Sequence, residues 1–131
     1  MGRKNTLRVY VTPTTTVPLQ SPTLATPPAV SLSTAFNTVY TNMDRLDNVS
    51  YQINITTTNS TGIFTLQASS DPLFVNWSTV GTAATVNGTN DTAIVWVNQE
   101  YCSAYVRLVY TPTIPGTGTC VIILTAKDIG A

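Results

Sequence analysis

The chain has 131 residues, the length of one ordinary domain, and only 9% of them are charged, six basic and six acidic. An average soluble domain has about 25% charged residues, so we expect neutral polar residues to form the surface and an assembly to cover much of it. Because histidine is absent, Ser-His-Asp and Cys-His catalytic systems and histidine-ligated metal sites are excluded.

Proline is dense between residues 12 and 34. Proline lacks the N–H that a sheet ladder needs and biases the preceding residue toward extended backbone. We therefore predict that residues 1–34 form an extended N-terminal arm that leaves the folded domain and runs along neighbouring subunits. The predicted interface residues of this arm are Arg3, Lys4, Leu7, Arg8, Val9, Val11, Val17, Leu19, Leu24 and Val30.

Within the arm, residues 6–11 alternate between apolar and polar side chains, which predicts a short strand. Addition of this strand to the sheet edge of a neighbouring subunit is the expected contact. The basic residues Arg3, Lys4 and Arg8 could contact either nucleic acid or an acidic subunit. Without an aromatic platform beside them, we favour the protein partner and expect no nucleic acid.

From residue 35 to residue 131 the dominant period is two, which is typical of half-buried strands. Alternating runs at 49–55 and 64–68 predict one antiparallel hairpin, and runs at 104–110 and 119–127 predict a closing pair. Shorter runs lie near Trp77 and at 93–97. With about seven or eight strands and no helix, the pattern predicts an all-β antiparallel β-sandwich of jelly-roll or immunoglobulin-like type.

The alternation also predicts which side chains point between the sheets, because a register slip of one residue would place the whole set in water. This predicted core consists of Val49, Tyr51, Ile53, Ile55, Phe64, Leu66, Trp77, Val106, Leu108, Ile122 and Leu124.

The remaining chemistry-bearing residues indicate no catalytic, cofactor or metal site. We expect the six carboxylates to lie in turns and at strand ends, where solvated acidic residues are common. These residues are Asp44, Asp47, Asp71, Asp91, Glu100 and Asp128. Cys102 and Cys120 are predicted to be about 26 Å apart along the strands, too far for a disulfide, so we expect two free thiols. The chain contains no apolar run of about 20 residues, so we expect no membrane partner.

Residues 46–127 resemble small β-sandwich virion proteins of tailed bacteriophages. The resemblance lies in residues 46–53 (LDNVSYQI), 62–71 (GIFTLQASSD), Trp77, 105–111 (YVRLVYT), 116–119 (GTGT) and 126–127 (AK). It implies a structural virion component of the head decoration or cement type, on the capsid surface and made in the cytoplasm of a bacterial host. The implied partners are the major capsid protein or other virion subunits, together with further copies of this chain.

A second function stays open, that of a fibre-like or lectin-like sandwich that binds a glycan on the host surface. Carbohydrate sites use exposed aromatic side chains, for which Trp77, Trp96, Tyr101 and Tyr105 are the candidates. A core position is the favoured interpretation for Trp77 and Tyr105.

Overall fold

The structure is a computed structural model that describes residues 5–18, 27–43, 46–57, 59–70, 76–87, 91–96, 104–114 and 116–128. The described residues form strands and connecting segments, with no helix among them. The all-β prediction is therefore confirmed for these residues. The strands are β1 (Asn5–Val11), β2 (Thr16–Pro18), β3 (Val30–Ser31), β4 (Phe36–Asn37), β5 (Thr41–Asn42), β6 (Leu46–Thr57), β7 (Thr61–Ser69), β8 (Ser78–Asn87), β9 (Asp91–Trp96), β10 (Tyr105–Ile114) and β11 (Gly118–Asp128).

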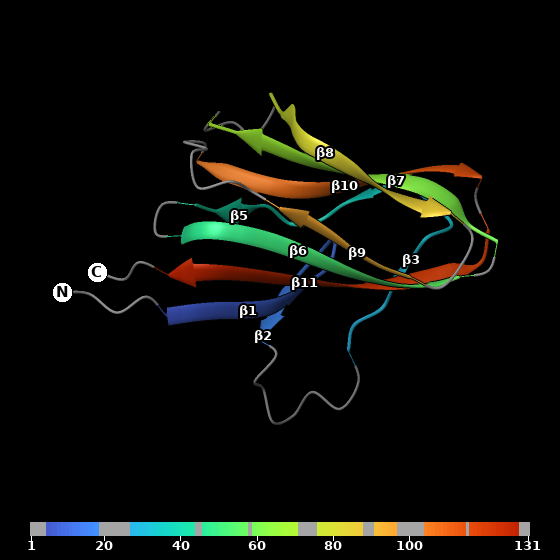
Figure 1. The fold of residues 1–131 in the computed structure, drawn as a ribbon, viewed down its shortest axis with the longest axis horizontal. Helices are drawn as coiled ribbons and strands as arrows, with labels where there is room; N and C mark the ends of the chain where they lie inside the picture. The colour runs from blue at the N-terminus through green and yellow to red at the C-terminus, as the bar shows by residue number, and fades with distance from the viewer. Residues whose placement is uncertain are drawn as a thin grey trace.

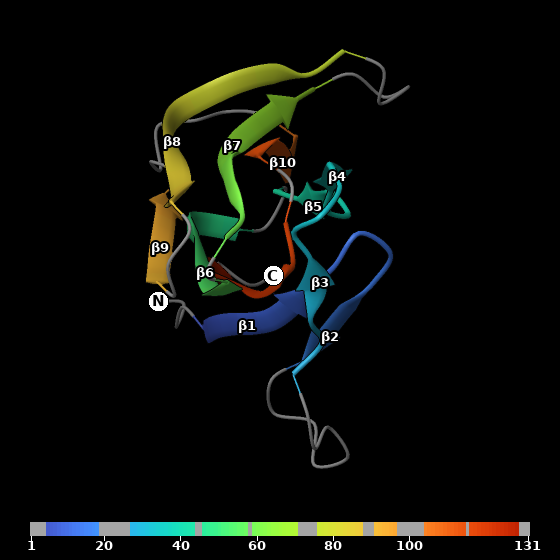
Figure 2. The same ribbon diagram turned by 90° about the vertical axis from the view of Figure 1, so that its right-hand side faces the viewer.

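Within the described residues the strands pair into two antiparallel sheets. The first sheet has the order β2-β1-β11-β6-β9, and β3 pairs with β11 beyond the end of β1. The second sheet has the order β4-β10-β7-β8, and β5 pairs with the other end of β10. The strands β7, β8 and β10 of the second sheet lie above β1, β6 and β11 of the first sheet in Figure 1, and Figure 2 shows the two layers end-on.

The core lies between the two sheets and follows the alternation of the strands. In β6 and β11, every second residue is buried, and the same holds for β7 and β10. Ten of the eleven predicted core residues are buried, namely Val49, Tyr51, Ile53, Ile55, Phe64, Leu66, Val106, Leu108, Ile122 and Leu124. The prediction for Trp77 is wrong, because this side chain is only half-buried and lies against Arg107 rather than between the sheets.

Two predicted strand pairings are also wrong. The runs at 49–55 and 64–68 do not form a hairpin, because β6 pairs with β11 and β9 whereas β7 pairs with β10 and β8. The closing runs are likewise divided, with β10 in the second sheet and β11 in the first. Periodicity specifies which face of a strand is buried but not which strand lies beside it. Both short connections therefore cross from one sheet to the other instead of turning back within a sheet.

The prediction of a short strand at residues 6–11 is confirmed, but the described parts of the predicted arm lie on the domain rather than apart from it. β1 pairs with β11 of its own chain along its whole length, from Asn5 opposite Asp128 to Val11 opposite Ile122. A turn follows, in which Thr12 Oγ1 accepts hydrogen bonds from the backbone N–H groups of Thr14 and Thr15. β2 then pairs back onto β1.

Residues 27–43 then pass from the first sheet to the second. Leu32 is fully buried, and its backbone N–H donates to the carbonyl of Gly118. The hydroxyl of Tyr110 in β10 donates to the Leu32 carbonyl at 3.1 Å. Phe36 adds a ring beside Tyr110, with centroids 5.4 Å apart. These contacts hold the segment of Leu32 and Phe36 against both sheets.

Candidate functional site

The predicted arm residues do not form an external binding surface in the part of the chain that the structure describes. Val9, Val11 and Val30 are buried in the chain's own core, so these three side chains contact their own chain, and their contact with a neighbouring subunit stays a prediction. The reason is that β11 offers an unpaired edge within the same chain, and β1 and β3 occupy it.

The other predicted arm residues have the following positions. Arg8 is exposed on β1, and Val17 is half-buried on β2. Leu7 lies in β1, with its side chain outside the described part of the structure. Arg3, Lys4, Leu19 and Leu24 lie outside the described residues.

Groups that could perform chemistry or bind metal are sparse in the described residues. No group of three or more His, Cys, Asp or Glu side chains that could hold a metal ion occurs among them. Cys120 is a free, buried thiol, as predicted, and burial raises its pKa to about 12. Cys102 lies outside the described residues, as do Asp44, Asp71 and Glu100. Among the described segments, none is a helix long and apolar enough to cross a membrane.

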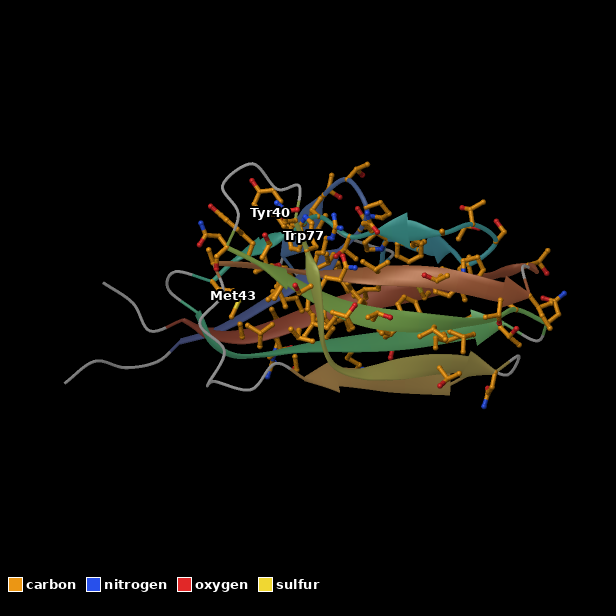
Figure 3. The ribbon with its side chains drawn as sticks, turned by 90° about the horizontal axis from the view of Figure 1, so that it is seen from above. Tyr40, Met43 and Trp77 are labelled. Carbon is orange, nitrogen blue, oxygen red and sulfur yellow. The ribbon has the colours of Figure 1, made fainter. Side chains whose placement is uncertain are left out.

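The outer face of the second sheet carries a different group of residues, which we call the outer-face cluster. It consists of Tyr40, Gln67, Trp77, Tyr105 and Arg107. Val106 and Leu108 are fully buried, so the alternation of β10 turns Tyr105 and Arg107 to the opposite face of the sheet, away from the core. Gln67 lies directly opposite Arg107 on β7. In Figure 3, Tyr40 and Trp77 lie over the same end of the molecule.

Two planar contacts hold the Arg107 side chain. Its Nε and Nη2 atoms both donate to Gln67 Oε1, at 3.0 and 2.8 Å. Its guanidinium carbon lies 4.1 Å from the centroid of the Trp77 ring, the distance of a cation–π contact. Partial burial lowers the pKa of the guanidinium, which nevertheless stays charged because an arginine pKa lies far above neutral pH. The cluster thus presents a fixed, partly desolvated cation.

Two tyrosines extend the cluster across β10. Tyr40 precedes β5 and is 47% exposed, and its ring meets the ring of Tyr105 edge to face with the centroids 5.3 Å apart. The hydrogen bonds from Thr38 N–H to the Leu108 carbonyl and from Leu108 N–H to Thr38 Oγ1 fix the segment before Tyr40 on β10. These two hydrogen bonds hold the backbone just before Tyr40 on β10, which places the Tyr40 ring beside Tyr105.

Charge is nearly absent from the rest of the second sheet. Arg107 is the only charged residue in the strands β4, β5, β7, β8 and β10. The outward positions of β7 and β10 are instead threonine, glutamine, isoleucine and valine, and Ile63 is 37% exposed. A sheet face with a single charge is typical of a surface that another molecule covers.

Sequence reasoning found part of this cluster. Tyr105 and Trp77 were glycan candidates, but both were expected in the core; they lie half-buried on the outer face. Trp96 lies in β9 with its side chain outside the described part, and Tyr101 lies outside the described residues. The sequence analysis did not predict a role for Arg107 or Gln67. The position of Arg107 between the predicted core residues Val106 and Leu108 does, however, predict a cation on the outer face of the strand.

Comparison with known proteins finds no relative of this chain. No family model, no curated protein and no solved structure matches the chain.

Proposed function

We propose that this protein is a non-enzymatic structural protein of a tailed-bacteriophage virion, of the head decoration or cement type. The observation that supports this most is the outer face of the second sheet, which has one charged residue in its five strands. An assembly protein needs a broad surface with few charges to desolvate, whereas a free monomer is kept soluble by mixed surface charge. The sequence resemblance to β-sandwich virion proteins supports the same role.

The proposal keeps the expected fold type and changes the expected mode of attachment. We propose that the two facing sheets form a β-sandwich; its jelly-roll or immunoglobulin-like type stays a prediction. Attachment runs through the sheet face, because β1, β2 and β3 are already paired in their own chain. Homo-oligomerisation on the capsid and a major capsid protein as partner are part of the proposal.

The direct test is the composition of purified particles. If the chain is encoded by a phage, mass spectrometry of gradient-purified virions is expected to find it in many copies per head. Heads from a deletion mutant are then expected to bind the purified protein again in a co-sedimentation assay. Absence of the chain from purified virions, with presence only in infected-cell lysate, would contradict the proposal.

A glycan-binding role is the alternative, favoured by the outward position of Trp77 and Tyr105. Carbohydrate sites stack a sugar ring on an exposed aromatic face. Here one face of Trp77 is taken by Arg107, and Tyr40 and Tyr105 contact each other edge to face. The aromatic faces are thus partly occupied from within the chain, so this alternative ranks second.

A further inference from the structure

We propose that Arg107 is the anchor of a docking site for an acidic segment of a partner protein, on the outer face of the second sheet. The proposal rests on the proposed function only for the partner's identity as a virion subunit. The chemistry of the site follows from the guanidinium itself, from its two neighbours and from the uncharged face around it.

Arg107 donates two of its N–H groups to a neighbouring side chain of the same sheet. A guanidinium has five N–H donors in a rigid plane. Gln67 Oε1 accepts one from Nε and one from Nη2. Both of these bonds lie on one edge of the guanidinium, the edge formed by Nε and Nη2. The second N–H of Nη2 and one of the two N–H groups of Nη1 point along the opposite edge as a parallel pair of donors.

A carboxylate is the ligand that fits a parallel pair of guanidinium N–H donors. Two parallel N–H donors match the two oxygens of a carboxylate, which makes this the strongest geometric fit for a planar guanidinium. Gln67 and Trp77 hold the guanidinium plane in advance, so less side-chain entropy is lost when the carboxylate binds.

Three classes of partner could bring an acidic group to Arg107: a nucleic acid, a sugar acid and a protein. Nucleic acid would require several phosphate-binding cations, whereas the strands of this sheet carry one. A sugar acid would need a free aromatic face, whereas Arg107 covers one face of Trp77 and the rings of Tyr40 and Tyr105 contact each other. A protein interface fits better, because tryptophan, tyrosine and arginine are the residues that most often dominate binding energy there. The neighbouring Tyr40 and Tyr105 favour an acidic residue that is flanked by apolar ones.

The test uses the full chain and a library of random 12-residue peptides, selected on the immobilised protein after depletion on the Arg107→Gln variant. We expect the recovered peptides to be enriched in Asp or Glu beside apolar residues. Their affinity should fall roughly 10- to 100-fold in Arg107→Gln, the value of a hydrogen-bonded charge pair, and also fall in Arg107→Lys, which lacks the planar pair of donors. Arg8→Gln removes the same charge from the exposed β1 of the first sheet and should change affinity less than about twofold.

Binding peptides without enrichment of Asp or Glu, or peptides that bind Arg107→Gln equally well, would overturn the proposal. NMR titration of the wild-type chain decides the question even if a variant fails to fold. The selected peptides should shift the Arg107 Nε–H and Trp77 indole N–H signals saturably. Saturable shifts of these signals with sialyllactose or glucuronic acid, and none with peptides, would also overturn it. None of these outcomes depends on whether purified virions contain the chain, so the two proposals fail separately.

Discussion

Leu66 and Leu108 lie directly opposite each other on β7 and β10, and both point into the core with at most 1% of their surface exposed. Replacing either leucine by alanine removes buried methyl groups and leaves a cavity. We expect Leu108→Ala to lower the free energy of unfolding by about 2–5 kcal/mol, measured by urea denaturation. Ile114→Ala is the matched control, because Ile114 is 61% exposed and its truncation should have little effect. Equal losses in the two variants would contradict the assigned core.

Burial also governs how the protein responds to alkali. Burial raises the pKa of the Tyr51 phenol and of the Cys120 thiol to about 12, while the hydroxyl of Thr41 partly opposes the shift at Tyr51. In the unfolded chain these groups lose their protons near about pH 10 and 8.5. Between those values and pH 12 the folded state holds more protons than the unfolded state. The contribution of these two groups to the free energy of unfolding should therefore be constant below about pH 8 and be lost as the pH rises toward 12.

Chemical denaturation at a series of pH values checks this dependence. The Tyr51→Phe variant removes the contribution of the Tyr51 phenol, so its stability should fall less steeply above about pH 10 than that of the wild type. Thr41 Oγ1 lies 3.5 Å from the Tyr51 hydroxyl, a long hydrogen bond, so the cost of the variant at neutral pH should be small. An unfolding free energy that stays flat from pH 8 to 11 would contradict the burial of both groups.

At the scale of elements, the decisive feature is β1, which completes the first sheet of its own chain. Val11 is 1% exposed at the core side of β1, whereas Arg8 is exposed on the same strand. A charge placed at position 11 has no described partner and would have to be buried. We expect Val11→Asp to lower the free energy of unfolding by on the order of 3–5 kcal/mol in the isolated protein.

The control for this prediction is Arg8→Asp, which changes charge at an exposed position of the same strand and should shift stability by about 0.5 kcal/mol or less. The comparison separates a strand of the domain from an arm that docks elsewhere. If β1 were a free arm, both variants would leave the stability of the isolated protein unchanged, and that result would contradict the described pairing with β11.

The sequence predicts the buried face of a strand better than it predicts which strand pairs with it. Alternation at Val49, Ile53 and Leu108 gave the buried faces correctly, because hydrophobic burial is a property of each strand by itself. The partner of a strand is a property of the whole chain. The alternation at Val9 and Val11 correctly indicated a strand that adds to a sheet edge, yet nothing local says that the edge belongs to the same molecule.

The candidate site was harder to predict for the same reason. The cluster joins Tyr40, Gln67, Trp77 and Arg107, which lie on four separate segments and meet only through the order of strands in the second sheet. The alternation and the apolar ring of Trp77 both favoured a core position. Its real neighbour is a cation thirty residues later, and such a contact leaves no period in the sequence.

At the scale of the whole molecule, the two sheets differ in how many charged residues their strands contain. In the first sheet, charged residues are present in β1, β6, β9 and β11, whereas Arg107 is alone in the strands of the second sheet. A molecule with this asymmetry should attach through the second sheet and leave the first toward solvent, because desolvating charges opposes binding. The account therefore predicts an orientation as well as a partner.

A cryo-EM map of assembled particles tests this central claim most directly. The account predicts that the chain lies on the head with the outer face of its second sheet against another virion subunit, and that an acidic side chain of that subunit meets the guanidinium of Arg107. The account would be contradicted by a map in which the chain attaches through the first sheet with Arg107 facing solvent, or in which the particle does not contain the chain.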